Sequence, residues 1–141
     1  MRRAIVAGWL VALACAPACA APLVKQIGAG LYVSAATNLR HLFQQHPEVI
    51  GVHYTGDTMP APARLTTMKD EMRENISKAK AQGAPPPDEA GLLLAYVGFQ
   101  TNDAAAVKDG LGALRQTKDG ATDPLTAVLE GVWVGVGKES K

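Results

Sequence analysis

The hydrophobic and polar positions follow a helical period along most of the chain, and one stretch stands apart. From 91 to 100 the sequence reads Gly-Leu-Leu-Leu-Ala-Tyr-Val-Gly-Phe-Gln, and its large apolar side chains cover nearly the whole circumference of a helix. A helix that is apolar on all sides is buried by other elements. The stretch is also too short for a membrane span, which needs about 20 apolar residues. The pattern therefore predicts a central helix enclosed by the rest of the chain.

Two amphipathic helices are predicted before this stretch. In the region 22–46 apolar residues recur every three or four positions, and two glycines in its first turns indicate that the helix begins only near Leu31. The region 64–82 has a cleaner stripe, and Gly83 occupies the favoured position after a helix end. The predicted buried stripes are Val24, Ile27, Leu31, Ala35, Leu39 and Leu42 in the first region and Leu65, Met68, Met72, Ile76 and Ala79 in the second.

Three helices are predicted after a Pro-rich spacer at 84–87. An aspartate precedes each of them, at Asp88, Asp103 and Asp123, and aspartate is a preferred N-cap residue. Short turns between consecutive helices favour antiparallel neighbours. The predicted fold is mainly α: a small up-down helical bundle of about five helices with one irregular or extended loop, residues 47–63.

The first twenty residues have the order of a secretory signal peptide. Arg2 and Arg3 precede an apolar run, and small residues follow it. The sequence Ala18-Cys19-Ala20 fits the A-x-A pattern of a cleavage site. We therefore expect cleavage between Ala20 and Ala21, with residues 21–141 forming a single helical domain in the periplasm or outside the cell.

Both cysteines of the chain lie in this targeting segment, at Cys15 and Cys19. Cleavage after Ala20 removes them, so the exported chain is expected to have neither a disulfide nor a thiol site. A lipoprotein acylated at one of these cysteines is the alternative. It is less favoured, because alanines stand three residues before each cysteine where bacterial lipoprotein signals carry leucine.

The charge of the exported chain points to no polyanionic partner. Without Arg2 and Arg3, 12 basic and 13 acidic residues remain, for a net charge of −1. A nucleic-acid-binding domain usually carries a basic surplus, so we expect no nucleic-acid partner. After cleavage no segment is apolar enough for a stable membrane span. The expected partner is another envelope or secreted protein.

No arrangement of residues in the sequence predicts catalysis, so we expect no catalytic residue, cofactor or metal. The function hypothesis is a non-enzymatic binding or accessory protein of the cell envelope, inhibitor-, immunity- or adaptor-like. The alternative is a small periplasmic hydrolase or metal-binding protein that uses the region of His41, His46 and His53. Against it, His41 and His46 are five residues apart, whereas a helical pair of metal ligands needs a spacing of about four.

The segment 46–64 is the predicted partner-binding site, with His53, Tyr54, Asp57 and Met59 at its centre. It is the longest stretch without a helical period, and long loops in compact domains are often functional. Tyrosine is enriched at binding hot spots. A competing interpretation is that the apolar residues of this segment simply cover the open side of the helical core.

Overall fold

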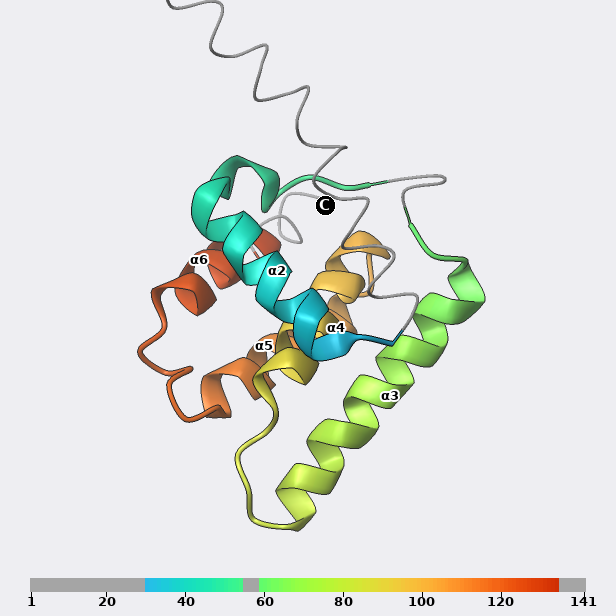
Figure 1. Ribbon diagram of the computed structural model, residues 1–141, viewed down its shortest axis with the longest axis vertical. Coiled ribbons are helices and arrows are strands. Elements are labelled where there is room, and N and C mark those ends of the chain that lie inside the picture. The colour runs from blue at the N-terminus through green and yellow to red at the C-terminus, as the bar shows by residue number, and fades with distance from the viewer. Residues whose placement is uncertain (1–29, 55–58, 135–141) are drawn as a thin grey trace, which may run out of the picture.

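A computed structural model of the protein describes residues 30–54 and 59–134 (Figure 1). Within these residues the chain forms five α-helices and one short 3₁₀ helix, and no β-strand. The elements are α2 (Tyr32–Gln45), η1 (Pro47–Val49), α3 (Pro62–Ala81), α4 (Asp88–Gln100), α5 (Ala104–Gln116) and α6 (Pro124–Trp133). The prediction of a mainly helical fold with about five helices is confirmed.

The central helix of this fold is α4, as the sequence predicts. Every residue from 90 to 99 is buried, and Leu92, Leu93 and Leu94 are fully enclosed. Helices α2, α3 and α5 all contact α4, and Figure 1 shows α2 and α3 lying against it. The apolar circumference of α4 is thus covered by α2, α3 and α5, and Trp133 of α6 packs against its Phe99 end.

Helix α3 lies on the outside of the molecule with one face toward the core. Its buried side chains repeat at helical spacing and are four of the five predicted, Leu65, Met68, Met72 and Ile76. The fifth, Ala79 in the last turn, is only partly buried. The helix begins two residues earlier than predicted, with Pro62 in the first turn, where proline loses no hydrogen bond. Gly83 follows the helix end with φ of +66°, a conformation that favours glycine.

Helices α4 and α5 form an antiparallel pair in close contact. Gly98, near the end of α4, faces Val107 near the start of α5, whereas Gly91 at the beginning of α4 faces Leu114 near the end of α5. A Cβ atom added at Gly98 would lie 2.7 Å from the Val107 amide nitrogen. The glycines therefore let the two backbones approach more closely than larger residues would.

Two of the three predicted N-caps are confirmed and one is wrong. The Ala106 amide donates to Asp103 Oδ1 at 3.0 Å, and the Leu125 amide donates to Asp123 Oδ1 at 3.1 Å. Asp88, in contrast, lies inside the first turn of α4 and makes no capping bond. Its carboxylate instead binds an arginine on α2, which the sequence pattern could not reveal.

Helix α2 begins at Tyr32, close to the predicted start, while residues 22–29 lie outside the described part of the chain. Leu31, a member of the predicted stripe, is 55% exposed because it precedes the helix. Phe43 takes a core position that the stripe did not include. The buried face of α2 therefore ends on an aromatic residue.

The predicted loop lies between α2 and α3 and starts with η1. Across residues 30–54 and 59–134, no helix is both long enough and apolar enough to span a membrane. The longest, α3, carries charged side chains along its outer face.

Candidate functional site

The predicted partner-binding residues fall on the segment between η1 and α3. His53 is exposed, and Tyr54 and Met59 are partly buried. Met59 packs against the hydrophobic core. Asp57 lies outside the described residues. The structure thus brings His53 and Tyr54 together at the end of α4.

Two side chains from neighbouring helices hold the backbone of this segment. The indole nitrogen of Trp133 donates to the Ile50 carbonyl at 2.8 Å. The side-chain amide of Gln100 makes two bonds: its nitrogen donates to the Val52 carbonyl at 2.9 Å, and its oxygen accepts from the Tyr54 amide at 2.8 Å. Gln100 therefore satisfies one backbone donor and one backbone acceptor of the same segment.

A stack of aromatic rings connects this segment to the core. The His53 ring lies 4.1 Å from the Phe99 ring, measured between centroids, and Phe99 stacks in turn on Trp133 at 5.4 Å. Trp133 also meets Phe43 edge-on at 5.9 Å. His53 is the exposed end of this stack, so its position is fixed by rings that belong to the core.

The two interpretations of the segment apply to different residues. Val49 and Ile50 are buried, so the first part of the segment does cover the core. Val52 is 37% exposed, and the exposed His53 follows it. The apolar side chains that remain accessible to a partner therefore begin at Val52.

Helix α6 extends the apolar surface next to this segment. A Cβ atom at Gly51 would lie 3.6 Å from a methyl group of Val132, so the segment and α6 are in contact. Val128, one helical turn before Val132, is 47% exposed, and residues four apart share a helix face. Val52 and Val128 are thus exposed apolar side chains on the two elements that meet at Gly51 and the partly buried Val132.

The three histidines do not meet at one point. His46 Nδ1 lies 3.0 Å from Glu48 Oε1, whereas His53 stacks on Phe99. The pKa of Glu48 is lowered, first by a backbone hydrogen bond and then by the one to His46. Within residues 30–54 and 59–134, no three histidine, cysteine or acidic side chains are placed to share a metal ion.

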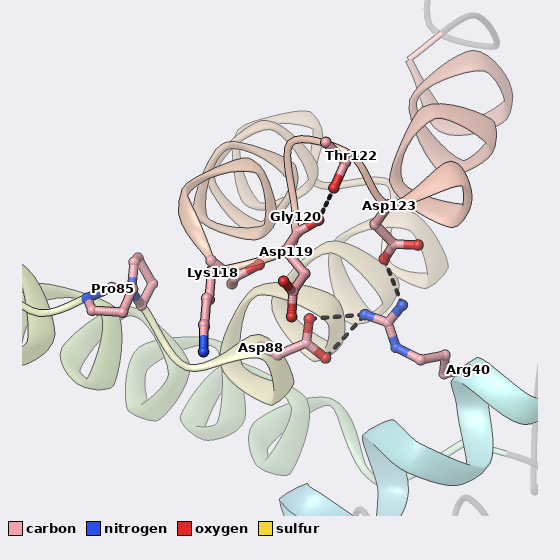
Figure 2. A pocket seen from close by; sticks show the side chains of 10 residues that line it. Arg40, Pro85, Asp88, Lys118, Asp119, Gly120, Thr122 and Asp123 are labelled. Carbon is pink, nitrogen blue, oxygen red and sulfur yellow. Dashed lines mark hydrogen bonds and ion pairs between the residues drawn. The ribbon is translucent and has the colours of Figure 1, made fainter.

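A second feature, which the sequence did not predict, is a hollow of about 560 Å³ between the starts of α4 and α6 (Figure 2). Its walls come from α2, from the Pro-rich spacer and from the turn between α5 and α6. The residues that line it are Arg40, Pro85, Pro86, Asp88, Thr117, Lys118, Asp119, Gly120, Thr122 and Asp123.

Arg40 joins three helices at one side of this hollow. Its Nη1 lies 2.5 Å from Asp123 Oδ2, and its Nη2 lies 2.8 and 3.0 Å from the two oxygens of Asp88. Burial alone would raise the pKa of Asp123, but hydrogen bonds from Arg40 and from the Leu125 amide outweigh it and hold that pKa below the usual value. One guanidinium thus binds the carboxylates at the starts of two helices.

Replacing Arg40 with methionine is expected to lower the free energy of unfolding by about 1 to 3 kcal/mol at neutral pH, since Asp123 loses a charged partner. A carboxyl group whose pKa is lowered by folding stabilises the protein above its unfolded pKa, and this stabilisation is lost as the pH falls through the folded pKa. The difference in the free energy of unfolding between wild type and Arg40→Met should therefore become smaller as the pH falls below 3.8, the usual pKa of aspartate. Urea unfolding at several pH values measures this difference.

Arg73→Met is the matched control for that experiment. Arg73 makes ion pairs of 3.5 and 3.8 Å at a more exposed position on α3, and exposed pairs contribute at most about 1 kcal/mol. If Arg40→Met is no less stable than Arg73→Met at neutral pH, the interaction of Arg40 with Asp123 does not stabilise the fold.

The hydrophobic pattern of the sequence gives Arg40 no predicted role. Its partners are 48 and 83 residues away, a separation that a helical period cannot detect. The available signal was an aspartate at the start of two later helices. A helix N-terminus favours a negative charge. The position of Asp88 and Asp123 at helix starts therefore accounted for both residues, and it gave no reason to expect an arginine partner.

Comparison of the chain with family models, characterised proteins and solved structures gave no match. The functional argument therefore rests on the residues and their geometry.

Proposed function

We propose that this chain is an exported, non-enzymatic binding protein of the cell envelope, which contacts another envelope or secreted protein through Val52 and His53. The observation that carries the proposal is the way this segment is held. Gln100 and Trp133 fix its backbone from two helices, while Val52 and His53 remain exposed.

A segment fixed in this way is suited to recognition for two physical reasons. Binding costs free energy when it orders side chains and loops, and a segment that is already ordered avoids most of that cost. Binding residues also commonly lie on loops that a rigid scaffold positions. Here the scaffold is the central helix itself, because Gln100 is its last residue and Phe99 supports the His53 ring.

The apolar valines next to His53 give the proposed surface a suitable composition. Interface centres are depleted in charge and rich in apolar area, and Val52 and Val128 supply exposed apolar area of this kind. A partner of matching chemistry would present an apolar or aromatic side chain to the valines and a hydrogen-bonding group to the exposed imidazole.

Export is the second part of this proposal, and the first twenty residues support it. The protein recovered from the cell envelope should begin at Ala21 and carry no lipid. Intact-mass measurement of that material tests the expectation. A chain that starts at Cys19 and carries acyl groups would show that the protein is a lipoprotein instead.

The binding proposal predicts that His53→Ala keeps the fold and loses the partner. The His53 side chain is exposed, so the variant should unfold within about 0.5 to 1 kcal/mol of wild type. Affinity isolation from envelope extract should then recover a partner with wild type and markedly less of it with His53→Ala. Thermal unfolding of the same preparations confirms that the variant is folded.

Thr66→Ala is the control, because Thr66 is an exposed residue on the outer side of α3. It should recover the partner as wild type does. Equal recovery with His53→Ala and Thr66→Ala would place the working surface elsewhere.

The hydrolase or metal-binding alternative has less support from the described residues. His46 pairs with Glu48 while His53 stacks on Phe99, so the two rings belong to different local structures. A metal site in this region would have to bring them together.

A further inference from the structure

The hollow between α4 and α6 contains two charged groups that the fold does not use. Arg40, Asp88 and Asp123 are bound to one another. Lys118 and Asp119 line the same hollow, and neither side chain makes an ion pair or hydrogen bond with any residue the structure describes. Figure 2 shows both side chains extending from the turn between α5 and α6 toward the start of α4.

The turn that carries these two groups has a fixed conformation. A Cβ atom at Gly120 would lie 1.6 Å from the Leu114 carbonyl oxygen, so the turn packs directly on the end of α5. The Thr117 hydroxyl donates to that same oxygen at 2.8 Å, and the Thr122 hydroxyl donates to the Asp119 carbonyl at 3.2 Å. Lys118 and Asp119 are therefore held at the edge of the hollow on a stable backbone.

The opposite wall is also stiff, because it is built by Pro85 and Pro86. Proline fixes its own backbone angle and restricts the residue before it. Asp88 follows these prolines and is fixed by Arg40, yet its carboxylate remains 48% exposed. A ligand in the hollow could therefore reach this carboxylate without breaking its ion pair.

The charges in the hollow divide into a compensated group and an uncompensated pair. Arg40 and the positive ends of the α4 and α6 dipoles balance Asp88 and Asp123. Lys118 and Asp119 remain, one positive and one negative. A simple cation would complement Asp119 and the exposed edge of Asp88 but not Lys118, and a simple anion would complement only Lys118.

We propose that this hollow binds a zwitterionic amino-acid group, either a free amino acid or the two ends of a short peptide. The ligand ammonium would bind Asp119 and the exposed edge of Asp88, and the ligand carboxylate would bind Lys118. A volume of about 560 Å³ is within the usual size of small-molecule sites. This site is separate from the surface around His53, so it does not depend on the binding function proposed above.

Backbone amide chemical shifts of the purified protein test this inference with matched probes. Alanine carries both charges, whereas ethylamine carries only the ammonium and propionate only the carboxylate. Alanyl-alanine carries both charges farther apart, so it distinguishes a peptide from a free amino acid. At least one zwitterion should give saturable shifts at residues 85–88 and 117–123, and it should bind at least about tenfold more tightly than either single-charge probe.

Charge-removing variants identify the groups responsible. Asp119→Asn and Lys118→Met should each lower the affinity for the zwitterion by about tenfold or more. The spectra of both variants without ligand should otherwise match that of wild type. Asp70→Asn removes a carboxylate on the exposed face of α3 and should bind as wild type does. The inference is overturned if neither zwitterion gives saturable shifts, if ethylamine or propionate binds as tightly, or if both pocket variants bind like wild type.

Discussion

Replacing Gly110 with alanine is expected to destabilise the protein by about 3 kcal/mol or more, because the added methyl group has no space between two packed backbones. Gly110 lies on α5 where this helix crosses α4. Its Cβ atom would lie 2.4 Å from the Ala95 amide nitrogen and 2.6 Å from the Gly91 carbonyl oxygen. Both atoms belong to the main chain of the central helix, so the two helices must move apart. Urea unfolding of the variant measures the loss.

Gly112→Ala is the matched control on the same helix. A Cβ atom at Gly112 meets no other atom within 4 Å, so this substitution changes only helix propensity, which favours alanine by about 1 kcal/mol. The two alanine variants should therefore shift stability in opposite directions. If Gly110→Ala is as stable as Gly112→Ala, α4 and α5 do not approach as closely as described.

Truncating Leu93 to alanine is expected to cost about 2 to 5 kcal/mol, the range for a buried leucine whose removal leaves a cavity. Leu93 is fully buried, and so are its neighbours Leu92 and Leu94. Three consecutive buried leucines on one helix require contacts on several sides of that helix. Denaturant unfolding measures this loss of unfolding free energy, with one slope of free energy against denaturant concentration fitted to both variants.

Lys78→Ala is the control for the leucine substitution. Lys78 pairs with Glu74 at 2.7 Å on the exposed side of α3, and an i,i+4 pair of this kind contributes about 0.3 to 0.5 kcal/mol. If Leu93→Ala is as stable as this variant, α4 is not enclosed. The apolar stretch would then be a surface for a dimer or partner.

Much of the fold could be predicted from the sequence because it depends on local patterns. The apolar circumference of α4 requires burial whatever surrounds it. The stripe on α3 gave its four buried side chains, and Asp103 and Asp123 lie at helix starts where a side chain can accept an amide bond. Each of these predictions uses residues close together along the chain.

The features that were missed join residues far apart along the chain. Arg40 binds Asp88 and Asp123 across 48 and 83 residues, and Gln100 holds a backbone segment 46 to 48 residues before it. Gly110 matters only because α4 lies against it. A helical period shows which face of a helix is buried, but it does not show which distant side chain meets that face.

The predicted site was only partly described by its residue types. The sequence grouped His53 with Tyr54, Asp57 and Met59 because they share a stretch without helical period. The structure shows that His53 is exposed at the end of an aromatic stack, whereas Met59 packs against the core. Val128 and Val132 could not be included from the sequence, because their helix begins about 70 residues later and meets the segment only in the folded chain.

Site-specific photo-crosslinking in the cell envelope tests the central claim most directly. A photoreactive side chain at position 52, which is exposed next to His53, should give a crosslink to one partner protein. The same side chain at position 66, on the outer side of α3, should not crosslink to that protein. The binding proposal predicts a partner that is captured from position 52 and not from position 66. Equal capture from both positions, or capture from position 66 alone, would contradict it.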